Sequence, residues 1–127
     1  MPLPEIRLVK ISLLKMTPWL SEMKAAGLSM AKSTNHYAIY RSSELVGFTG
    51  LMWIGTTARF KSSYVFPQYR RQGIYNVSQK LLIAIAEAGN ATVLEATATK
   101  MSRQWFLDNG FEVVTQFKDM VKVEKPV

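Results

Sequence analysis

Hydrophobic residues alternate with polar ones, or form short β-branched runs, over several segments in the first half of the chain. Such segments, bounded by turn residues, are typical of β-strands. They predict four strands, at residues 5–12, 37–41, 45–54 and 60–66. The short polar stretch of Ser42, Ser43 and Glu44 separates the second strand from the third, which predicts a hairpin between them.

The hydrophobic spacing becomes helical after Gly73. Apolar side chains recur there at helical intervals, at Ile74, Val77, Leu81, Ile85 and Ala88. This spacing predicts a helix over residues 73–88 that ends at Gly89 and Asn90. The pattern then predicts a strand over residues 92–97, a short helix over residues 101–109 and a hairpin over residues 112–124.

A shorter helix is indicated closer to the start of the chain. Thr17 can cap free N–H groups, and Pro18 suits the first helical position. An apolar stripe follows and stops near Gly27. The polar residues 28–35 then predict a loop.

Length and composition limit the number of domains and the setting. The chain has 127 residues, of which 48% are hydrophobic, so we expect residues 1–127 to form one domain with one core. The absence of cysteine excludes disulfides and thiolate metal sites and favours a reducing, cytoplasmic location. The longest uncharged run, residues 45–58, is too short to span a bilayer, so we expect a soluble protein with no membrane partner.

Residues 65–75 carry the strongest chemical signal. They lead from the end of a predicted strand through Pro67, two arginines and Gly73 into a helix. Backbone N–H groups in such a turn converge, and the helix adds about half a positive charge at its N-terminus, so the turn can hold a diphosphate. Arg70 and Arg71 add mobile positive charge. An ordinary strand-to-helix turn with solvated arginines would use the same residues.

This segment resembles motif A of the GNAT superfamily of acyl-CoA N-acyltransferases. That motif reads Arg/Gln-x-x-Gly-x-Gly/Ala after a strand that ends in Val-x-Pro. Val65, Pro67, Arg70 and Gly73 match it.

The resemblance continues on both sides of the motif, over about residues 37–123. Residues 94–99 and 102–111 are similar to the family's fifth strand and fourth helix, and residues 37–54 resemble its central hairpin. The resemblance implies an α/β (α+β) fold in one GNAT-like domain. Its central twisted sheet would be mixed and mostly antiparallel, with six to seven strands flanked by helices and a V-shaped cofactor cleft between strands four and five.

The resemblance also implies a donor and the residues that bind it. The donor would be acetyl-CoA or another acyl-CoA. Val65 would offer main-chain hydrogen bonds to the pantetheine arm near the thioester carbonyl, with Phe66 beside it. Thr99 stands where the family usually has an asparagine. The residues expected to hold the diphosphate are Arg70, Arg71, Gln72, Gly73, Ile74, Tyr75 and Asn76.

Several positions depart from the family's pattern. Tyr75 is bulky where motif A is usually small, and Phe106 replaces a tyrosine that often protonates the leaving thiolate. The fourth strand has no carboxylate to serve as a base, so Glu95 is the candidate base and Ser102 a candidate acid. His36 is the only histidine, which excludes two-histidine metal sites, and no metal is expected.

The formal net charge of +7 favours an acidic partner, although basic residues spread along the whole chain would also suit a solvated surface. We expect Arg59 and Lys61 to share a strand face with Val65, because side chains alternate along a strand. They would then line a cationic groove for an anionic acceptor. The function expected from the resemblance is therefore an N-acyltransferase, most simply an N-acetyltransferase, that acts on an amine of an unidentified acceptor.

Two other interpretations stay open. One is a GNAT-like enzyme that modifies nucleic acid, resembling the phage enzymes that acylate DNA bases, or a transferase acting on RNA. The other is a non-catalytic GNAT-like binding module for nucleic acid or a protein, which the missing tyrosine and base favour. A homodimer is compatible with either.

Overall fold

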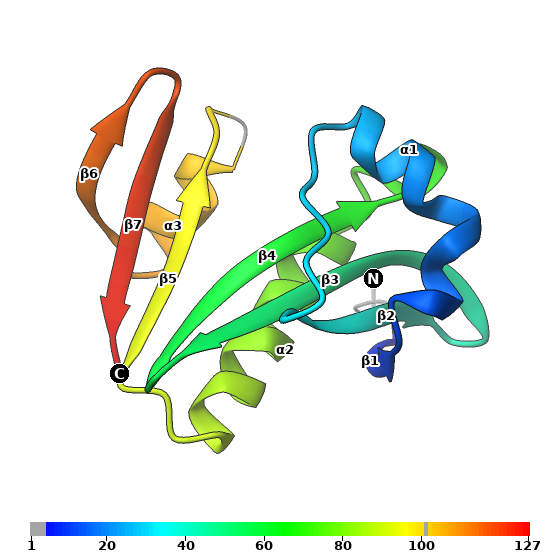
Figure 1. Ribbon diagram of the computed structural model, residues 1–127, viewed down its shortest axis with the longest axis horizontal. Helices are drawn as coiled ribbons and strands as arrows, with labels where there is room; N and C mark the ends of the chain where they lie inside the picture. Colours follow the sequence, from blue (N-terminus) through cyan, green and yellow to red (C-terminus); the bar gives the residue numbers. More distant parts are fainter. Residues whose placement is uncertain (1–4, 101) are drawn as a thin grey trace.

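Seven strands form one sheet in the structure, a computed structural model that describes residues 5–100 and 102–127. The strand order is β1-β2-β3-β4-β5-β7-β6, and only β4 and β5 run parallel (Figure 1). The strands are β1 (Ile6–Ile11), β2 (Asn35–Arg41), β3 (Glu44–Ile54), β4 (Thr57–Val65), β5 (Val93–Ala98), β6 (Glu112–Phe117) and β7 (Met120–Pro126). The expected mixed, mostly antiparallel sheet is therefore confirmed.

Helices cover both faces of this sheet. They are η1 (Leu14–Trp19) and η2 (Pro67–Tyr69), both 3-10 helices, and α1 (Leu20–Ala25), α2 (Ile74–Ala88) and α3 (Arg103–Asp108). Leu82 of α2 and Phe106 of α3 share one buried cluster, whereas Met23 of α1 packs in another with Tyr64. Val65 packs against α2, so neighbouring residues of β4 face opposite helix layers. Among the described helices, none is long and apolar enough to cross a membrane.

The sheet divides between β4 and β5. These strands pair only at Thr57↔Val93, Ala58↔Leu94 and Arg59↔Glu95. Beyond Arg59, β4 stays paired with β3 and β5 stays paired with β7, and the two halves separate (Figure 1). This confirms the V-shaped opening expected between strands four and five.

A β-bulge at Ser62 reverses the side-chain alternation along β4. Phe48 pairs with Tyr64 but Gly50 pairs with Lys61, and Ser62 has a φ of +58°. Before the bulge, Phe60 faces the α2 layer, so Arg59 and Lys61 point to the opposite face. After the bulge, Val65 faces the α2 layer. The expectation that Arg59 and Lys61 share the face of Val65 is therefore wrong, because one extra residue inverts the pattern.

The first helix also differs from its expected start. Thr17 and Pro18 lie inside η1, and the Thr17 hydroxyl donates a 2.6 Å hydrogen bond to the Leu14 carbonyl instead of capping a helix. The α-helix begins only at Leu20. The helix expected over residues 101–109 is found as α3, and Met101 lies outside the described residues.

Candidate functional site

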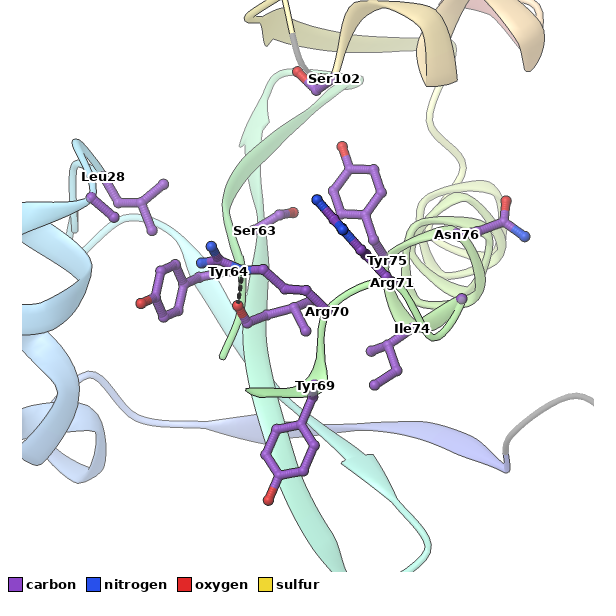
Figure 2. Close-up of a pocket in the computed structure, with 13 residues that line it drawn as sticks. Leu28, Ser63, Tyr64, Tyr69, Arg70, Arg71, Ile74, Tyr75, Asn76 and Ser102 are labelled. Carbon is purple, nitrogen blue, oxygen red and sulfur yellow. Dashed lines mark hydrogen bonds between the residues drawn. The ribbon is translucent and has the colours of Figure 1, made fainter. Parts of the chain in front are cut away.

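A cleft of about 610 Å³ lies where β4 ends and α2 begins (Figure 2). Its walls come from β4, from the loop before α2, from the first turn of α2 and from the segment after α1. The lining residues are Ala26, Leu28, Ser63, Tyr64, Val65, Tyr69, Arg70, Arg71, Gly73, Ile74, Tyr75, Asn76 and Ser102. Six residues expected to bind the cofactor therefore come together here with Val65.

The loop before α2 presents backbone N–H groups to this cleft. Arg71 and Gly73 adopt left-handed conformations, with φ of +63° and +81°. The first N–H of the helix that bonds to the backbone is that of Val77, which donates to the Gly73 carbonyl at 3.2 Å. In the described part of the chain, the four preceding N–H groups, of residues 73–76, have no acceptor. They form a site with positive potential, to which the helix dipole adds.

The side chain of Arg70 turns toward β4. Its Nε donates a 2.8 Å hydrogen bond to the Val65 carbonyl oxygen, and its Cζ lies 5.3 Å from the centroid of the Tyr64 ring. The Tyr64 hydroxyl in turn donates to Glu22 Oε2 at 2.7 Å. The end of β4 is thereby linked to α1, a contact that the sequence pattern did not reveal.

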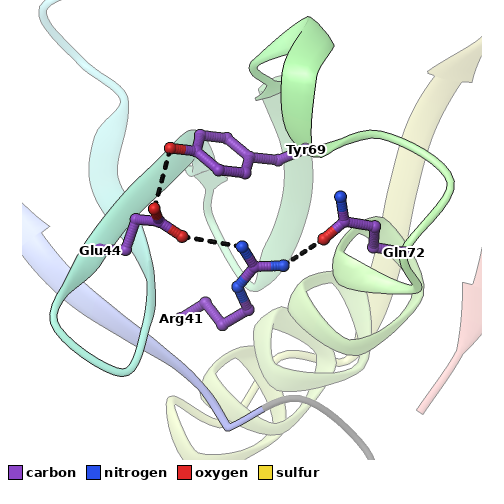
Figure 3. A network of polar contacts seen from close by, with 4 residues as sticks. All are labelled: Arg41, Glu44, Tyr69 and Gln72. Carbon is purple, nitrogen blue, oxygen red and sulfur yellow. Dashed lines mark hydrogen bonds and ion pairs between the residues drawn. The ribbon is translucent and has the colours of Figure 1, made fainter.

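Gln72 belongs to a polar network on the outer side of the loop (Figure 3). Arg41 donates to Gln72 Oε1, and its Nη2 lies 2.7 Å from Glu44 Oε1. The Tyr69 hydroxyl donates to Glu44 Oε2 at 3.1 Å. Hydrogen bonds from Arg41 and Tyr69 hold the pKa of Glu44 below its usual value. The network ties the loop to the hairpin of β2 and β3. The sequence pattern placed Glu44 only in a turn and did not indicate these contacts.

A second cavity, of about 260 Å³, occupies the gap between the diverging β4 and β5. Leu28, Ser63, Tyr75 and Ser102 line both cavities, so the two adjoin. The other lining residues are Phe60, Lys61, Ser62, Gln79, Ala96, Thr97, Thr99 and Phe106. Lys61, the expected acceptor contact, and Thr99, an expected cofactor contact, both line this gap.

A chain of hydrogen-bonded polar groups, with Gln79 buried at its centre and Ser63 half-buried, leads from the sheet to Tyr75. Gln79 Nε2 donates to the Tyr75 hydroxyl at 3.2 Å, and Gln79 Oε1 accepts a 3.1 Å hydrogen bond from Ser63. Burial raises the pKa of Tyr75. The Tyr75 ring packs edge-on against Trp105 of α3, whose Nε1 donates to Asn76 Oδ1 at 2.9 Å. The first turn of α2 is therefore fixed against α3.

The two candidate catalytic residues have different surroundings. Glu95 forms ion pairs with Arg59 at 2.5 Å and with Lys122 at 3.4 Å, and it lines neither cavity. Ser102 lines both cavities, and its Oγ accepts a 3.0 Å hydrogen bond from the Thr99 N–H.

Other expected site residues lie outside the two cavities. Phe66 is buried in the α1 layer, and neither Gln72 nor Arg59 lines a cavity. Within the described residues, no three histidine, cysteine, aspartate or glutamate side chains gather as a metal site would require.

No protein-family model and no curated protein matches the sequence. Solved structures match the fold. The PaiA N-acetyltransferase from Thermoplasma acidophilum, solved with coenzyme A, aligns at a TM-score of 0.76 and 16% identity over 97% of this chain and 99% of that chain. The ribosomal-protein-S18-alanine N-acetyltransferase from Escherichia coli aligns at a TM-score of 0.76 and 14% identity over 96% of this chain and 94% of that chain. An acetyltransferase from Thermus thermophilus aligns at a TM-score of 0.78 and 13% identity over the full length of both chains. The chain has the fold of the GNAT N-acetyltransferases.

Proposed function

We propose that the protein is an acyl-CoA-dependent N-acyltransferase that moves an acyl group, most simply acetyl, from acetyl-CoA or another acyl-CoA to an amine. One observation carries the proposal: the gap between β4 and β5 adjoins a loop with unpaired N–H groups. A long donor with an anionic end and a reactive end fits this arrangement. The presence of coenzyme A in a structural neighbour supports the same donor.

The loop would hold the diphosphate of the donor. The free N–H groups of residues 73–76 are oriented donors, and they need no side chain to bind an anion. Arg71 lines the cleft and adds a positive charge (Figure 2). The hydrogen bond from Arg41 to Gln72 holds the loop from its outer side. These contacts restrain the loop, which reduces the entropy lost on binding.

The gap would hold the pantetheine arm and the thioester. Coenzyme A supplies the acyl group as a thioester that an amine can attack. Because β4 and β5 do not pair beyond Arg59, strand pairing leaves their facing edges open to the amides of the arm, and on β4 the Val65 carbonyl accepts from the Arg70 side chain instead. Ser63 and Thr99 lie on opposite sides of the gap, close to where the acyl group would react.

The acceptor would approach from the face that carries Lys61. Lys61 lines the gap and points away from the α2 layer, so donor and acceptor would meet from opposite sides of the sheet. This cation favours an anionic acceptor, and an amine on nucleic acid is a specific candidate within that class.

A non-catalytic binding module is the second candidate function, favoured by Phe106, which lines the gap without a hydroxyl.

Calorimetric titration with acetyl-CoA tests the proposal first. We expect saturable binding with one site, in the micromolar range common for donor substrates. Release of free thiol with a panel of amines, including polyamines, peptides and single-stranded DNA, then measures turnover. Absence of binding at millimolar acetyl-CoA would reject the proposal. Binding without thiol release for any amine would favour the binding module.

A further inference from the structure

Tyr75 stands at the junction of the two cavities. It lines both the cleft beside the loop and the gap between β4 and β5. Figure 2 shows its ring rising from the start of α2 with the hydroxyl directed toward Ser102. Edge-on packing against Trp105, with ring centroids 5.9 Å apart, keeps the ring in this direction. A donor that extends from the loop into the gap would pass this hydroxyl.

The Tyr75 oxygen is held as a hydrogen-bond acceptor. Gln79 Nε2 donates to it, while Gln79 Oε1 accepts from Ser63, and the Ser63 and Thr49 hydroxyls lie 2.7 Å apart. Gln79 is 1% exposed and Thr49 is fully buried, so water does not compete for these groups. Among the described residues, no group accepts the proton of Tyr75. That proton is therefore available to a ligand in the gap.

The other hydroxyls at the gap are less suited to give up a proton. Ser62 donates to the Ser29 carbonyl at 3.0 Å, and Ser63 donates to Gln79. Ser102 is an aliphatic alcohol, which is a far weaker acid than a phenol. Tyr75 is the tyrosine that lines this second cavity. Among these hydroxyls the phenol has the usual pKa closest to that of a free thiol, about 10 against about 8.5. Burial raises the pKa of Tyr75 further, so its proton can move to sulfur only as a C–S bond breaks and negative charge develops there.

We propose that Tyr75 is the catalytic acid that protonates the thiolate leaving group of the acyl-CoA. The inference rests on the proposed function and adds a residue to it. The amine nitrogen bonds to the thioester carbon, the C–S bond breaks with its electron pair on sulfur, and the Tyr75 proton passes to that sulfur. The tyrosinate then takes up, through water, the proton that the acceptor nitrogen loses. The N–H of Gln79 stabilises the transient negative charge on the phenolic oxygen.

Burial also raises the pKa of Tyr75, so the hydroxyl stays protonated between turnovers at neutral pH. The charged side chains that line the same two cavities are Lys61, Arg70 and Arg71, all cationic. Three neutral hydroxyls border both cavities, and those of Ser63 and Ser102 are aliphatic alcohols, so the phenol of Tyr75 is the most acidic of the three.

The test is Tyr75→Phe, measured for acetyl-CoA affinity by calorimetry and for kcat and acceptor KM by thiol release. We expect kcat to fall about 100-fold or more, the usual contribution of a general acid, with affinity and acceptor KM within about twofold of wild type. Tyr40→Phe is the matched control, because this ring lies on β2 and lines neither cavity. It should leave all three constants unchanged.

The outcomes separate this inference from the function beneath it. A Tyr75→Phe protein that retains kcat within about threefold overturns the role of Tyr75 and leaves the acyltransferase proposal standing. A folded Tyr75→Phe protein that no longer binds acetyl-CoA also overturns it, because Tyr75 would then be a binding residue. Failure of the wild type to bind acetyl-CoA rejects the proposed function itself.

Discussion

The Nε atom of Arg70 donates a 2.8 Å hydrogen bond to the carbonyl oxygen of Val65, the last residue of β4. The guanidinium also lies 5.3 Å from the Tyr64 ring centroid, so the side chain covers the end of the strand (Figure 2). Arg70 therefore occupies the main-chain group that a pantetheine arm would pair with. Binding of the proposed donor requires Arg70 to exchange the Val65 carbonyl for another partner, and the diphosphate is the nearest candidate.

This exchange predicts opposite effects of Arg70→Met on two donors. The variant should bind acetyl-pantetheine, which lacks the diphosphate, at least as tightly as the wild type does, because the Val65 carbonyl is freed. Acetyl-CoA should bind about 3- to 10-fold more weakly, since one charge-assisted contact worth roughly 1 kcal/mol is lost. Calorimetry with both ligands measures the ratio, and Arg7→Met, a change on β1, is the control. Equal weakening of both ligands would contradict the exchange.

Gly73 and a second glycine, Gly55, allow a matched test of the loop. Both have positive φ, +81° and +60°, and a Cβ added at either would meet no atom within 4 Å. Alanine at either position should thus cost about 1–2 kcal/mol of unfolding free energy through backbone strain alone. Only Gly73→Ala should weaken acetyl-CoA binding, because Gly55 lies in the turn between β3 and β4. A similar loss of affinity in both variants would mean that general destabilisation, not loop shape, controls binding.

The order of elements could be predicted from the sequence because it depends on local periodicity. The helical spacing of apolar residues from Ile74 to Ala88 marks the extent of α2, but its buried positions are Ile74, Ser78, Gln79, Leu82 and Ala86, so of the expected stripe only Ile74 is fully buried. The apolar and β-branched runs of β2 and β3 mark these two strands. The direction of Arg59 and Lys61 could not be predicted in the same way. A bulge adds one residue without changing composition, and Ser62 is not a residue type that marks a left-handed conformation.

The candidate site was predicted where it depends on the backbone and missed where it depends on tertiary contacts. The turn around Gly73 has a local signature, and it forms the cleft as expected. The hydrogen bond from Arg41 to Gln72 joins residues far apart in the sequence, and nothing in either local pattern indicates the other. Glu95 looked available for catalysis because its pairing with Arg59 depends on the register of two parallel strands.

Glu95 should contribute to stability more than to chemistry. Glu95 is 6% exposed, and its carboxylate pairs with Arg59 and Lys122. Removing the charge of Glu95 leaves the partly buried Arg59 without its partner. We expect Glu95→Gln to lower the unfolding free energy by about 1–3 kcal/mol, with kcat per folded molecule unchanged. Glu124→Gln is the control, because its contact with Lys122 is 3.7 Å long and more exposed, and should cost less than about 1 kcal/mol. A large fall in kcat with full stability would instead establish Glu95 as the base.

His36 should make the fold sensitive to mild acid. The ring is buried between β2 and the preceding loop, its Nε2 lies 3.2 Å from the Ala31 carbonyl, and its Nδ1 has no partner among the described residues. Burial lowers the pKa of His36, and this outweighs the hydrogen bond to Ala31, which raises it. The unfolded chain therefore takes up a proton at a higher pH than the folded one. The free energy of unfolding should be highest above the usual histidine pKa of about 6.5. It should fall as the pH drops from there toward the lowered pKa of the folded state.

The size of this effect has an upper limit, which makes the measurement decisive. One proton bound only by the unfolded chain can change the unfolding free energy by at most about 1.4 kcal/mol per pH unit. Urea unfolding between about pH 7.5 and pH 5 stays above the range in which most carboxylates titrate, and His36 is the only histidine of the chain. His36→Gln keeps a donor for the Ala31 carbonyl and cannot titrate, so its stability should be nearly flat over this range. Parallel slopes in the variant and the wild type would show that the folded protein accepts the His36 proton as readily as the unfolded chain does.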